Sequence, residues 1–264
     1  MLRRFRKLLR YINLLGVAPA VRWVAIRVGN RYNLVSRTTR VEMAPGMLHP
    51  VAMRVRGSSD PMVFDQIFID ADLADLTARV SGARVIVDLG ANVGYASIFF
   101  LNAFPDAFVL AVEPDPENAE ICARNLASYG DRARLIKAAI WNNPGRLVLS
   151  RGAFRDGKEW TTQVRPARPA ETADVEAVDV PSLLQMCPQP IIDILKIDIE
   201  GSEAVLFGTG AEDWLKSVRN FCVEIHSTEA ASIIHQALRS FRFESIQSGE
   251  YNVYLNLQER TARP

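Results

Sequence analysis

The chain has 264 residues, which is enough for one sizeable α/β domain with an appendage. Hydrophobic residues make up 48% of it, which excludes a disordered chain. The net charge of +1 hides an uneven distribution, because residues 1–41 hold ten of the 31 Lys and Arg residues and none of the 30 Asp and Glu residues. The rest of the chain is therefore acidic. Such asymmetry is typical of a surface that meets anionic lipid or an acidic partner.

The chain has few of the cysteines and histidines that mark an exported, disulfide-linked protein or a zinc-binding protein. Cys122, Cys187 and Cys222 lie far apart in the sequence, and the chain has three histidines. This pattern excludes a disulfide framework and a His/Cys zinc cluster. No apolar run reaches the roughly 20 residues that a membrane-spanning helix needs, and Arg10 interrupts the apolar part of a start that resembles an export signal. We therefore expect a cytoplasmic protein.

Residues 1–40 predict a basic helical extension. Apolar residues recur at helical spacing from Leu2 to Leu15 with basic residues on the other face, and a second apolar and basic stretch covers 21–28. Two interpretations are open. The helices pack on the acidic remainder of the chain or on a second subunit of a homodimer, or they make a peripheral contact with anionic lipid at the inner membrane face.

The remainder predicts an α/β fold. Residues 41–82 are expected to be lead-in elements packed on the main domain, with short strands and loops up to Phe68 and a helix over 73–80. The main domain, 83–264, has predicted strands at 85–88, 108–113, 133–138, 191–197, 220–225, 243–247 and 251–256. Predicted helices cover 95–103, 117–128 and 228–240, and another begins at Glu203. This alternation predicts a doubly wound parallel sheet closed by an antiparallel pair.

The alternation stops between about 142 and 190, which we interpret as an insertion. Residues 147–150 and 161–164 are predicted to form a hairpin, followed by a loop over 165–169. From its position we expect this insertion to face the substrate.

A glycine-rich loop follows the first strand of the main domain, with the sequence Asp88-Leu89-Gly90-Ala91-Asn92-Val93-Gly94. Gly90 allows the backbone to turn sharply beside a ligand, and Gly94 allows tight packing where the next helix begins. The spacing is not GxGxxG, and Asp88 would repel a pyrophosphate but accept hydrogen bonds from an ammonium group. Glu113, at the end of the next strand, can accept hydrogen bonds from both hydroxyls of a ribose. These features favour S-adenosylmethionine over NAD.

Several motifs resemble the FkbM-type methyltransferases. They are Val87 to Gly94, Glu113-Pro114-Asp115-Pro116, Leu195-Lys196-Ile197-Asp198-Ile199-Glu200-Gly201-Ser202-Glu203 and Val223-Glu224-Ile225-His226, with Gly57 to Asp60 and Phe64 to Phe68 upstream. The similarity spans about 54–254 and departs from the family at 69–72, where an acidic-aromatic pair is missing. It implies a Rossmann-like class I methyltransferase fold, whose seven-stranded, mostly parallel sheet has an antiparallel last strand. It also implies methyl transfer to a hydroxyl of a sugar, a glycolipid or a specialised metabolite.

In this fold the acceptor meets the methyl group near the ends of the fourth and fifth strands. Lys196, Asp198 and Glu200 occupy the first of these ends, on one side if the strand continues, and Glu224 and His226 occupy the second. In one mechanism His226 or Asp198 accepts the hydroxyl proton directly. In another, Asp198, Glu200 and Glu224, with or without His226, hold Mg²⁺, which acidifies the hydroxyl. A purely structural alternative pairs Lys196 with Glu224 and lets His226 cap a strand.

Other residues are weaker candidates for the cofactor site. Trp141 is a candidate to flank the adenine, Ser59 with Asp60 to reach the cofactor or the acceptor, and Asp115 to complete the site; ordinary packing is the alternative for each. A protein that binds S-adenosylmethionine without turnover would not need the Asp198, Glu200 and His226 cluster. A protein acceptor stays open. A nucleic-acid partner is not expected, because the positive charge is confined to one amphipathic segment.

Overall fold

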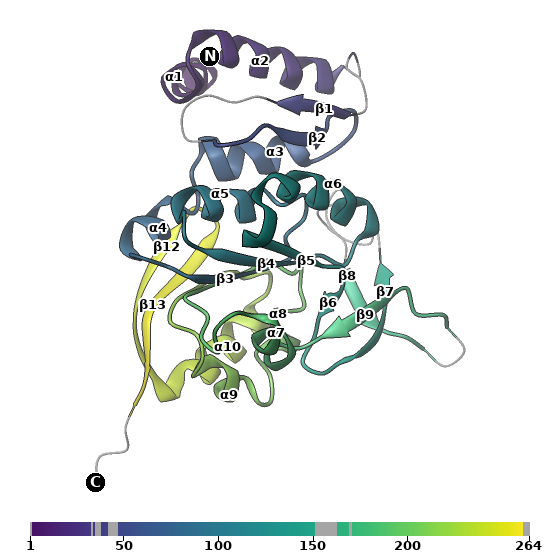
Figure 1. Ribbon diagram of the computed structural model, residues 1–264, viewed down its shortest axis with the longest axis vertical. Helices are drawn as coiled ribbons and strands as arrows, with labels where there is room; N and C mark the ends of the chain where they lie inside the picture. The colour runs from purple at the N-terminus through teal and green to yellow at the C-terminus, as the bar shows by residue number, and fades with distance from the viewer. Residues whose placement is uncertain are drawn as a thin grey trace.

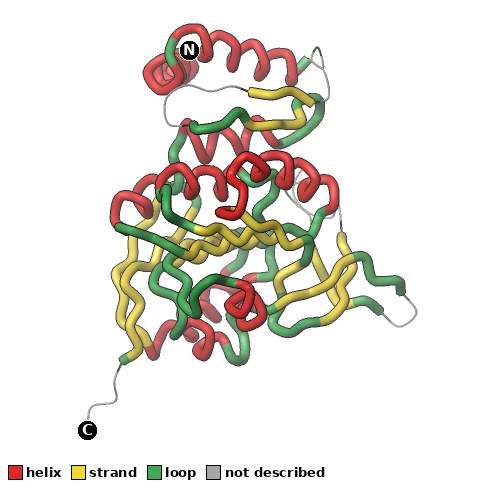
Figure 2. The backbone as a smooth tube through the Cα atoms, in the orientation of Figure 1, coloured by secondary structure: helices red, strands yellow, loops and turns green. Residues whose placement is uncertain are grey.

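The structure, a computed structural model, describes residues 2–32, 34, 38–41, 47–150, 163–168 and 171–260. A seven-stranded sheet lies at its centre in the order β12-β13-β11-β10-β3-β4-β5 (Figures 1 and 2). Its strands are β3 (Val85–Leu89), β4 (Phe108–Val112), β5 (Ala133–Ile136), β10 (Ile194–Ile197), β11 (Phe221–Glu224), β12 (Phe241–Ser248) and β13 (Tyr251–Glu259). β13 runs antiparallel to both β11 and β12, and the other neighbours pair in parallel. This confirms the predicted seven-stranded sheet with an antiparallel last strand.

Helices cover both faces of the sheet, and for that reason all five residues of β3 are buried (Figure 1). One face carries α4 (Ala74–Arg79), α5 (Tyr95–Ala103) and α6 (Pro116–Leu126). The other carries α7 (Val180–Met186), α8 (Glu203–Leu206), α9 (Ala211–Leu215) and α10 (Thr228–Ala237). Each face has its own apolar core. The predicted helices are confirmed with small shifts of their ends. α7 and α9 were not predicted: α7 lies where the alternation was expected to stop, and both helices are too short to leave a periodic signal.

The lead-in segment differs from its prediction. β1 (Thr38–Val41) and β2 (Val51–Arg54) pair antiparallel, as short strands should. The prediction of loops up to Phe68 is wrong, because α3 (Asp60–Phe64) and a π-helical turn, η1 (Asp65–Ile69), follow. Pro61 lies in the first turn of α3, where a missing N–H costs nothing and the fixed φ favours a helix.

The N-terminal helices α1 (Leu2–Leu15) and α2 (Val17–Arg31) pack on this lead-in segment. The buried carboxylate of Asp65 accepts hydrogen bonds from Tyr11 Oη and from Trp23 Nε1, each at 2.8 Å. Arg10 forms an ion pair with Asp70. The interpretation that these helices pack on acidic parts of the same chain is therefore confirmed. The homodimer and the membrane contact stay predictions, and none of the described helices is long and apolar enough to cross a bilayer.

The insertion forms a second, four-stranded sheet beside β5, in the order β6-β9-β7-β8 (Figure 1). Its strands are β6 (Ala139–Ile140), β7 (Gly145–Ser150), β8 (Gln163–Pro166) and β9 (Val175–Val178). Antiparallel pairing of β7 with β8 confirms the hairpin, although Thr161 and Thr162 lie outside the described residues. Several boundaries were wrong. β8 continues through Arg165 and Pro166, and β5 ends at Ile136 because the chain leaves for the small sheet. The small sheet begins at Ala139 and ends at Val178, whereas the insertion was expected at about 142–190.

Tyr11→Phe tests how firmly the extension is held. The substitution keeps the ring but removes a buried hydrogen bond to a carboxylate, so we expect the free energy of unfolding to fall by about 1.5–3 kcal/mol. Urea denaturation measures this change. Tyr32→Phe, at a tyrosine that is 63% exposed, is the matched control and should leave stability unchanged. Equal stability of the two variants would contradict the role given to the Tyr11 contact.

Candidate active site

The glycine-rich loop turns sharply at the end of β3. The backbone N–H groups of Gly90 and Ala91 both donate to the Val112 carbonyl, at 3.0 Å, which draws the loop over the end of β4. Gly90 has φ +75°, and a Cβ there would lie 1.8 Å from the carbonyl oxygen of Asp198. Gly94 has φ +85°, and its Cβ would lie 3.0 Å from Cys122 Sγ. Gly90 therefore permits a close approach of backbone that no other residue allows, and Gly94 permits a positive φ beside the Cys122 side chain.

A buried lysine joins this loop to β10. Lys196 Nζ donates to the Gly90 carbonyl at 2.8 Å and lies 3.1 Å from Asp88 Oδ1 and 3.5 Å from Asp198 Oδ2. Burial by itself lowers the pKa of Lys196, but the charges of Asp88 and Asp198 outweigh burial and raise it. The structural alternative that paired Lys196 with Glu224 is therefore replaced by pairing with Asp88 and Asp198.

The Asp88 side chain is buried in the protein interior beneath the glycine-rich loop. Its carboxylate is fully buried between Lys196 Nζ and Ser97 Oγ, which donates a hydrogen bond at 2.6 Å. Asp88 does not line the cavity described next. The expected direct contact between Asp88 and the ammonium group of a ligand is therefore wrong, because a side chain of the protein already supplies that ammonium.

A cavity opens at the carboxyl ends of β3, β4, β10 and β11. It encloses about 1070 Å³ of empty space, counting the part open to solvent. Seven predicted site residues line it: Gly90, Asn92, Glu113, Lys196, Asp198, Glu200 and Glu224. β6 and β8 of the small sheet contribute Ala139, Ile140 and Val164, so the insertion does reach this cavity.

Glu113 presents a carboxyl group to one end of the cavity. Its Oε2 accepts from the Asn92 N–H, and its Oε1 accepts from the Asp115 N–H and from Asn118 Nδ2. Burial raises the pKa of Glu113 to about 7 and outweighs these three hydrogen bonds, which lower it. A carboxylate has about four acceptor positions, so roughly one is left, on Oε2. That position suits one ribose hydroxyl, where the sequence suggested two.

The other end of the cavity is acidic. Asp198 and Glu224 follow adjacent parallel strands, and Tyr251 Oη donates to Asp198 Oδ2 at 3.3 Å. The predicted alternation of Lys196, Asp198 and Glu200 is wrong, because β10 ends at Ile197 and Glu200 has φ +49°. Glu200 still lines the cavity, but it does so from the turn that follows the strand.

His226 lies beneath this acidic end and does not line the cavity. Its Nδ1 lies 2.8 Å from Glu203 Oε1, and its Nε2 lies 3.2 Å from Glu224 Oε1 and 3.6 Å from Glu200 Oε2. Burial lowers the pKa of His226, but its hydrogen bond with Glu203 and the charges of these glutamates raise it to about 10. An imidazole that holds its proton at neutral pH does not take one from a hydroxyl, which argues against His226 as the direct base.

Four further candidates do not line the cavity and have structural contacts instead. The Ser59 carbonyl accepts from backbone N–H groups at the start of α3, and Asp60 forms an ion pair with Arg54. Asp115 caps α6 by accepting from the N–H groups at 117 and 118. Trp141 packs on the core of the small sheet.

Sequence reasoning missed several groups that do line the cavity, among them Asp72, Glu250 and Tyr251. Tyr251 begins β13, and Asp72 lies in the turn before α4. Tyr251 could have been found from the antiparallel last strand, because that strand pairs with β11 and brings its first residue opposite Glu224. No local signal in the sequence marks Asp72.

The chain is similar in sequence to known methyltransferases. The model of the methyltransferase FkbM domain matches residues 88–245. Methyltransferase sdnD from Sordaria araneosa is 32% identical over 196 residues, which cover 61% of this chain and 73% of that protein. The 2-O-methyltransferase NoeI from Sinorhizobium fredii is 31% identical over 146 residues, which cover 50% of this chain and 60% of NoeI. Among solved structures, a precorrin-6y C5,15-methyltransferase from Geobacter metallireducens aligns with a TM-score of 0.44 at 12% identity, over 73% of this chain and 88% of that one.

Gly90→Ala tests the close approach of the loop to β10. The new methyl group would meet the Asp198 carbonyl, so we expect a loss of stability by urea denaturation well beyond the about 1–2 kcal/mol that a positive φ costs a non-glycine residue. Gly82→Ala is the matched control, since Gly82 also has a positive φ, +65°, but nothing within 4 Å of its Cβ position. Equal losses in the two variants would show that the approach is not tight.

Proposed function

This chain belongs to the FkbM methyltransferase family, and we propose that it transfers the methyl group of S-adenosylmethionine to a hydroxyl oxygen of a sugar, a glycolipid or a specialised metabolite. One observation carries the proposal. A single cavity has Glu113 at the end next to β4 and the acidic groups Asp198, Glu200 and Glu224 at the end next to β10 and β11, with the glycine-rich loop between them. The first end suits a nucleoside, and the second suits a polar acceptor.

The charge of the cavity also fits this cofactor. Six carboxyl groups line it, those of Asp72, Glu113, Asp198, Glu200, Glu224 and Glu250, and Lys196 is the one basic residue in the described lining. S-adenosylmethionine carries positive charge on its sulfur and on its ammonium group, whereas a dinucleotide carries negative charge on its pyrophosphate. A negative field in a partly enclosed site attracts the first ligand and repels the second.

Methyl transfer needs an acceptor oxygen in line with the bond from the methyl carbon to sulfur. The oxygen forms a bond with the methyl carbon while the carbon–sulfur bond breaks, and its electron pair stays on sulfur as a neutral thioether. The hydroxyl proton passes to a carboxylate at the acidic end of the cavity. The name of the relative NoeI, a 2-O-methyltransferase, supports an oxygen acceptor.

A protein that binds S-adenosylmethionine without turnover is the second candidate. It would use Glu113 and the loop in the same way but would have no use for three carboxyl groups at the far end of the cavity. Incubation with methyl-labelled cofactor and a panel of glycan, glycolipid and polyketide acceptors separates the two functions. Transfer of label to an acceptor that Asp198→Asn slows, at unchanged cofactor affinity, supports the proposal. Binding without transfer to any of the acceptor classes would favour the second candidate.

Glu113→Gln tests the cofactor end. A ribose hydroxyl donates best to the ionised carboxylate, and the pKa of Glu113 is about 7, so wild-type affinity for S-adenosylmethionine should rise from about pH 6 and level off near pH 8. In Glu113→Gln the affinity should fall by about tenfold or more and lose this pH dependence. Calorimetry at each pH measures both effects.

Two further results check this interpretation of Glu113. Because its pKa is raised in the folded state, Glu113 contributes stability below about pH 4.5 that is lost as the pH rises through about 7 in the ligand-free protein. Glu117→Gln, a neighbouring exposed glutamate outside the cavity, is the control and should leave cofactor affinity unchanged. Wild-type affinity in Glu113→Gln would contradict the ribose assignment.

A further inference from the structure

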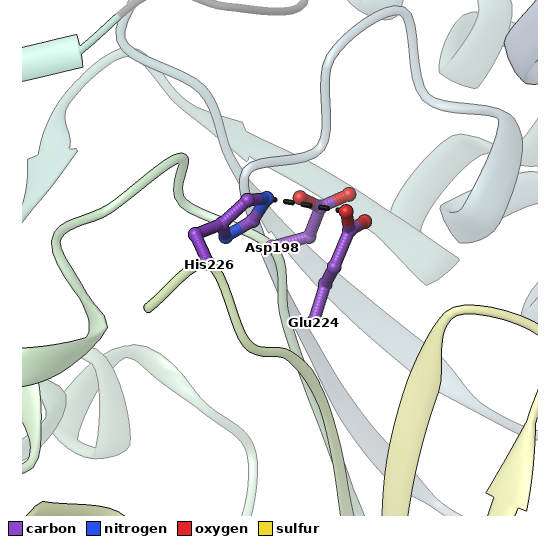
Figure 3. Close-up of side chains that lie close together, drawn as sticks. All are labelled: Asp198, Glu224 and His226. Carbon is purple, nitrogen blue, oxygen red and sulfur yellow. Dashed lines mark ion pairs between the residues drawn. The ribbon is translucent and has the colours of Figure 1, made fainter. Parts of the chain in front are cut away.

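We infer that Asp198, Glu224 and His226 bind a divalent transition-metal ion at the acceptor end of the cavity. One ligand atom from each of the three side chains lies within 4.8 Å of the other two. Figure 3 shows the three side chains converging from the ends of β10 and β11, with the His226 ring directed at the two carboxylates. Because β10 and β11 are adjacent and parallel, the backbone of the sheet holds all three ligands in place.

The second observation is the state of His226 Nε2. The His226 side chain is 2% exposed, and its Nε2 is buried and forms no hydrogen bond within the described residues, although the carboxylates of Glu224 and Glu200 are close. Burial of a polar atom without such a bond is costly. Loss of the Nε2 proton would leave a lone pair aimed between the two carboxylates, where a metal ligand would be placed, and binding of a metal releases such a proton.

The opposite nitrogen of the same ring supports this assignment. His226 Nδ1 lies 2.8 Å from Oε1 of the fully buried Glu203. In metal sites a ligating histidine usually donates its other N–H to a carboxylate, which fixes the tautomer and orients the ring. Glu203 at the start of α8 is therefore a positioning residue for His226, a use that the sequence did not suggest.

The ligand set selects the kind of ion. Two carboxylates favour Mg²⁺, Ca²⁺ and Mn²⁺, whereas an imidazole favours Mn²⁺, Fe²⁺, Zn²⁺ and their neighbours. One histidine with two carboxylates therefore points to a first-row transition metal and away from the Mg²⁺ that a set of carboxylates alone suggests. Glu200, which the sequence proposed as a ligand, lies outside this group of three.

The chemistry gives such an ion a role, which rests on the proposed function. Carboxylates beside a hydroxyl raise its pKa and so oppose removal of its proton. Asp198 and Glu224 line the cavity, so a divalent ion bound to them would face the acceptor and lower the pKa of its hydroxyl. The proton would pass to the Glu200 carboxylate in the same wall. The oxygen would then take the methyl carbon, and the electron pair of the broken bond would stay on sulfur.

Binding of the metal can be measured without cofactor or acceptor. We would strip the full chain with a chelator, add Mn²⁺ and follow the loss of the free-ion signal by electron paramagnetic resonance. We expect one Mn²⁺ per chain, with affinity at least about tenfold weaker in Glu224→Gln and in His226→Asn. Mg²⁺ should bind more weakly than Mn²⁺, and His226→Asn should reduce that preference.

Glu113→Gln is the matched control, because it removes a carboxylate from the opposite end of the same cavity and should leave Mn²⁺ affinity unchanged. Glu224→Gln should in turn retain S-adenosylmethionine affinity, so that failure of the metal site and failure of the cofactor site give different results. Circular dichroism of each variant reports its folding, and Glu224→Gln tests the site even if His226→Asn does not fold. The inference is overturned if wild type binds no Mn²⁺, or if Glu224→Gln binds Mn²⁺ as wild type does.

Discussion

The ammonium group of Lys196 is the contact on which the rest of the site depends. In the parallel pair of β3 and β10, Lys196 lies opposite Asp88, so two charged side chains meet inside the sheet. Lys196 Nζ also donates a hydrogen bond to the Gly90 carbonyl and lies near the Asp198 carboxylate. A buried charge left without its partner costs about 3–5 kcal/mol. Strand register, loop conformation and the position of Asp198 are therefore tied to one group.

The two ends of the cavity are consequently built as one unit. Gly90 lies against the backbone of Asp198, so the cofactor loop and the acidic end share a wall. The same loop continues to Asn92, whose N–H holds Glu113. A displacement of Lys196 would move Gly90, and the loop would transmit this movement to Asn92 and to the Glu113 carboxyl group. Loss of the contact between Lys196 and Gly90 is therefore expected to weaken cofactor binding and to disturb acceptor alignment together, although different residues line the two ends of the cavity.

The sequence predicted the sheet and seven residues of the cavity lining because both follow from local patterns. Apolar runs mark the strands, and the carboxyl ends of parallel strands meet at one edge, which brings Glu113, Asp198 and Glu224 together. It failed where the outcome depends on a partner far along the chain. No residue near Asp88 in the sequence indicates that its carboxylate forms an ion pair with Lys196. Pro61 suggests a loop, although the segment after it is helical because its apolar residues reach the core beside α1 and α2. These contacts form only in the folded chain.

The acidic lining has a consequence for the direction of the proposed reaction. Methyl transfer converts a positively charged sulfur into a neutral thioether, while the ribose that Glu113 would hold is unchanged. In a cavity with six carboxyl groups and one lysine, the cofactor before transfer is therefore attracted more strongly than the cofactor product. The same field disfavours loss of a proton from the acceptor, unless a cation lies between Asp198 and Glu224. A cavity of this charge thus favours exchange of the neutral cofactor product for a new S-adenosylmethionine. A positive charge beside the acceptor, such as the proposed ion, would favour loss of the hydroxyl proton.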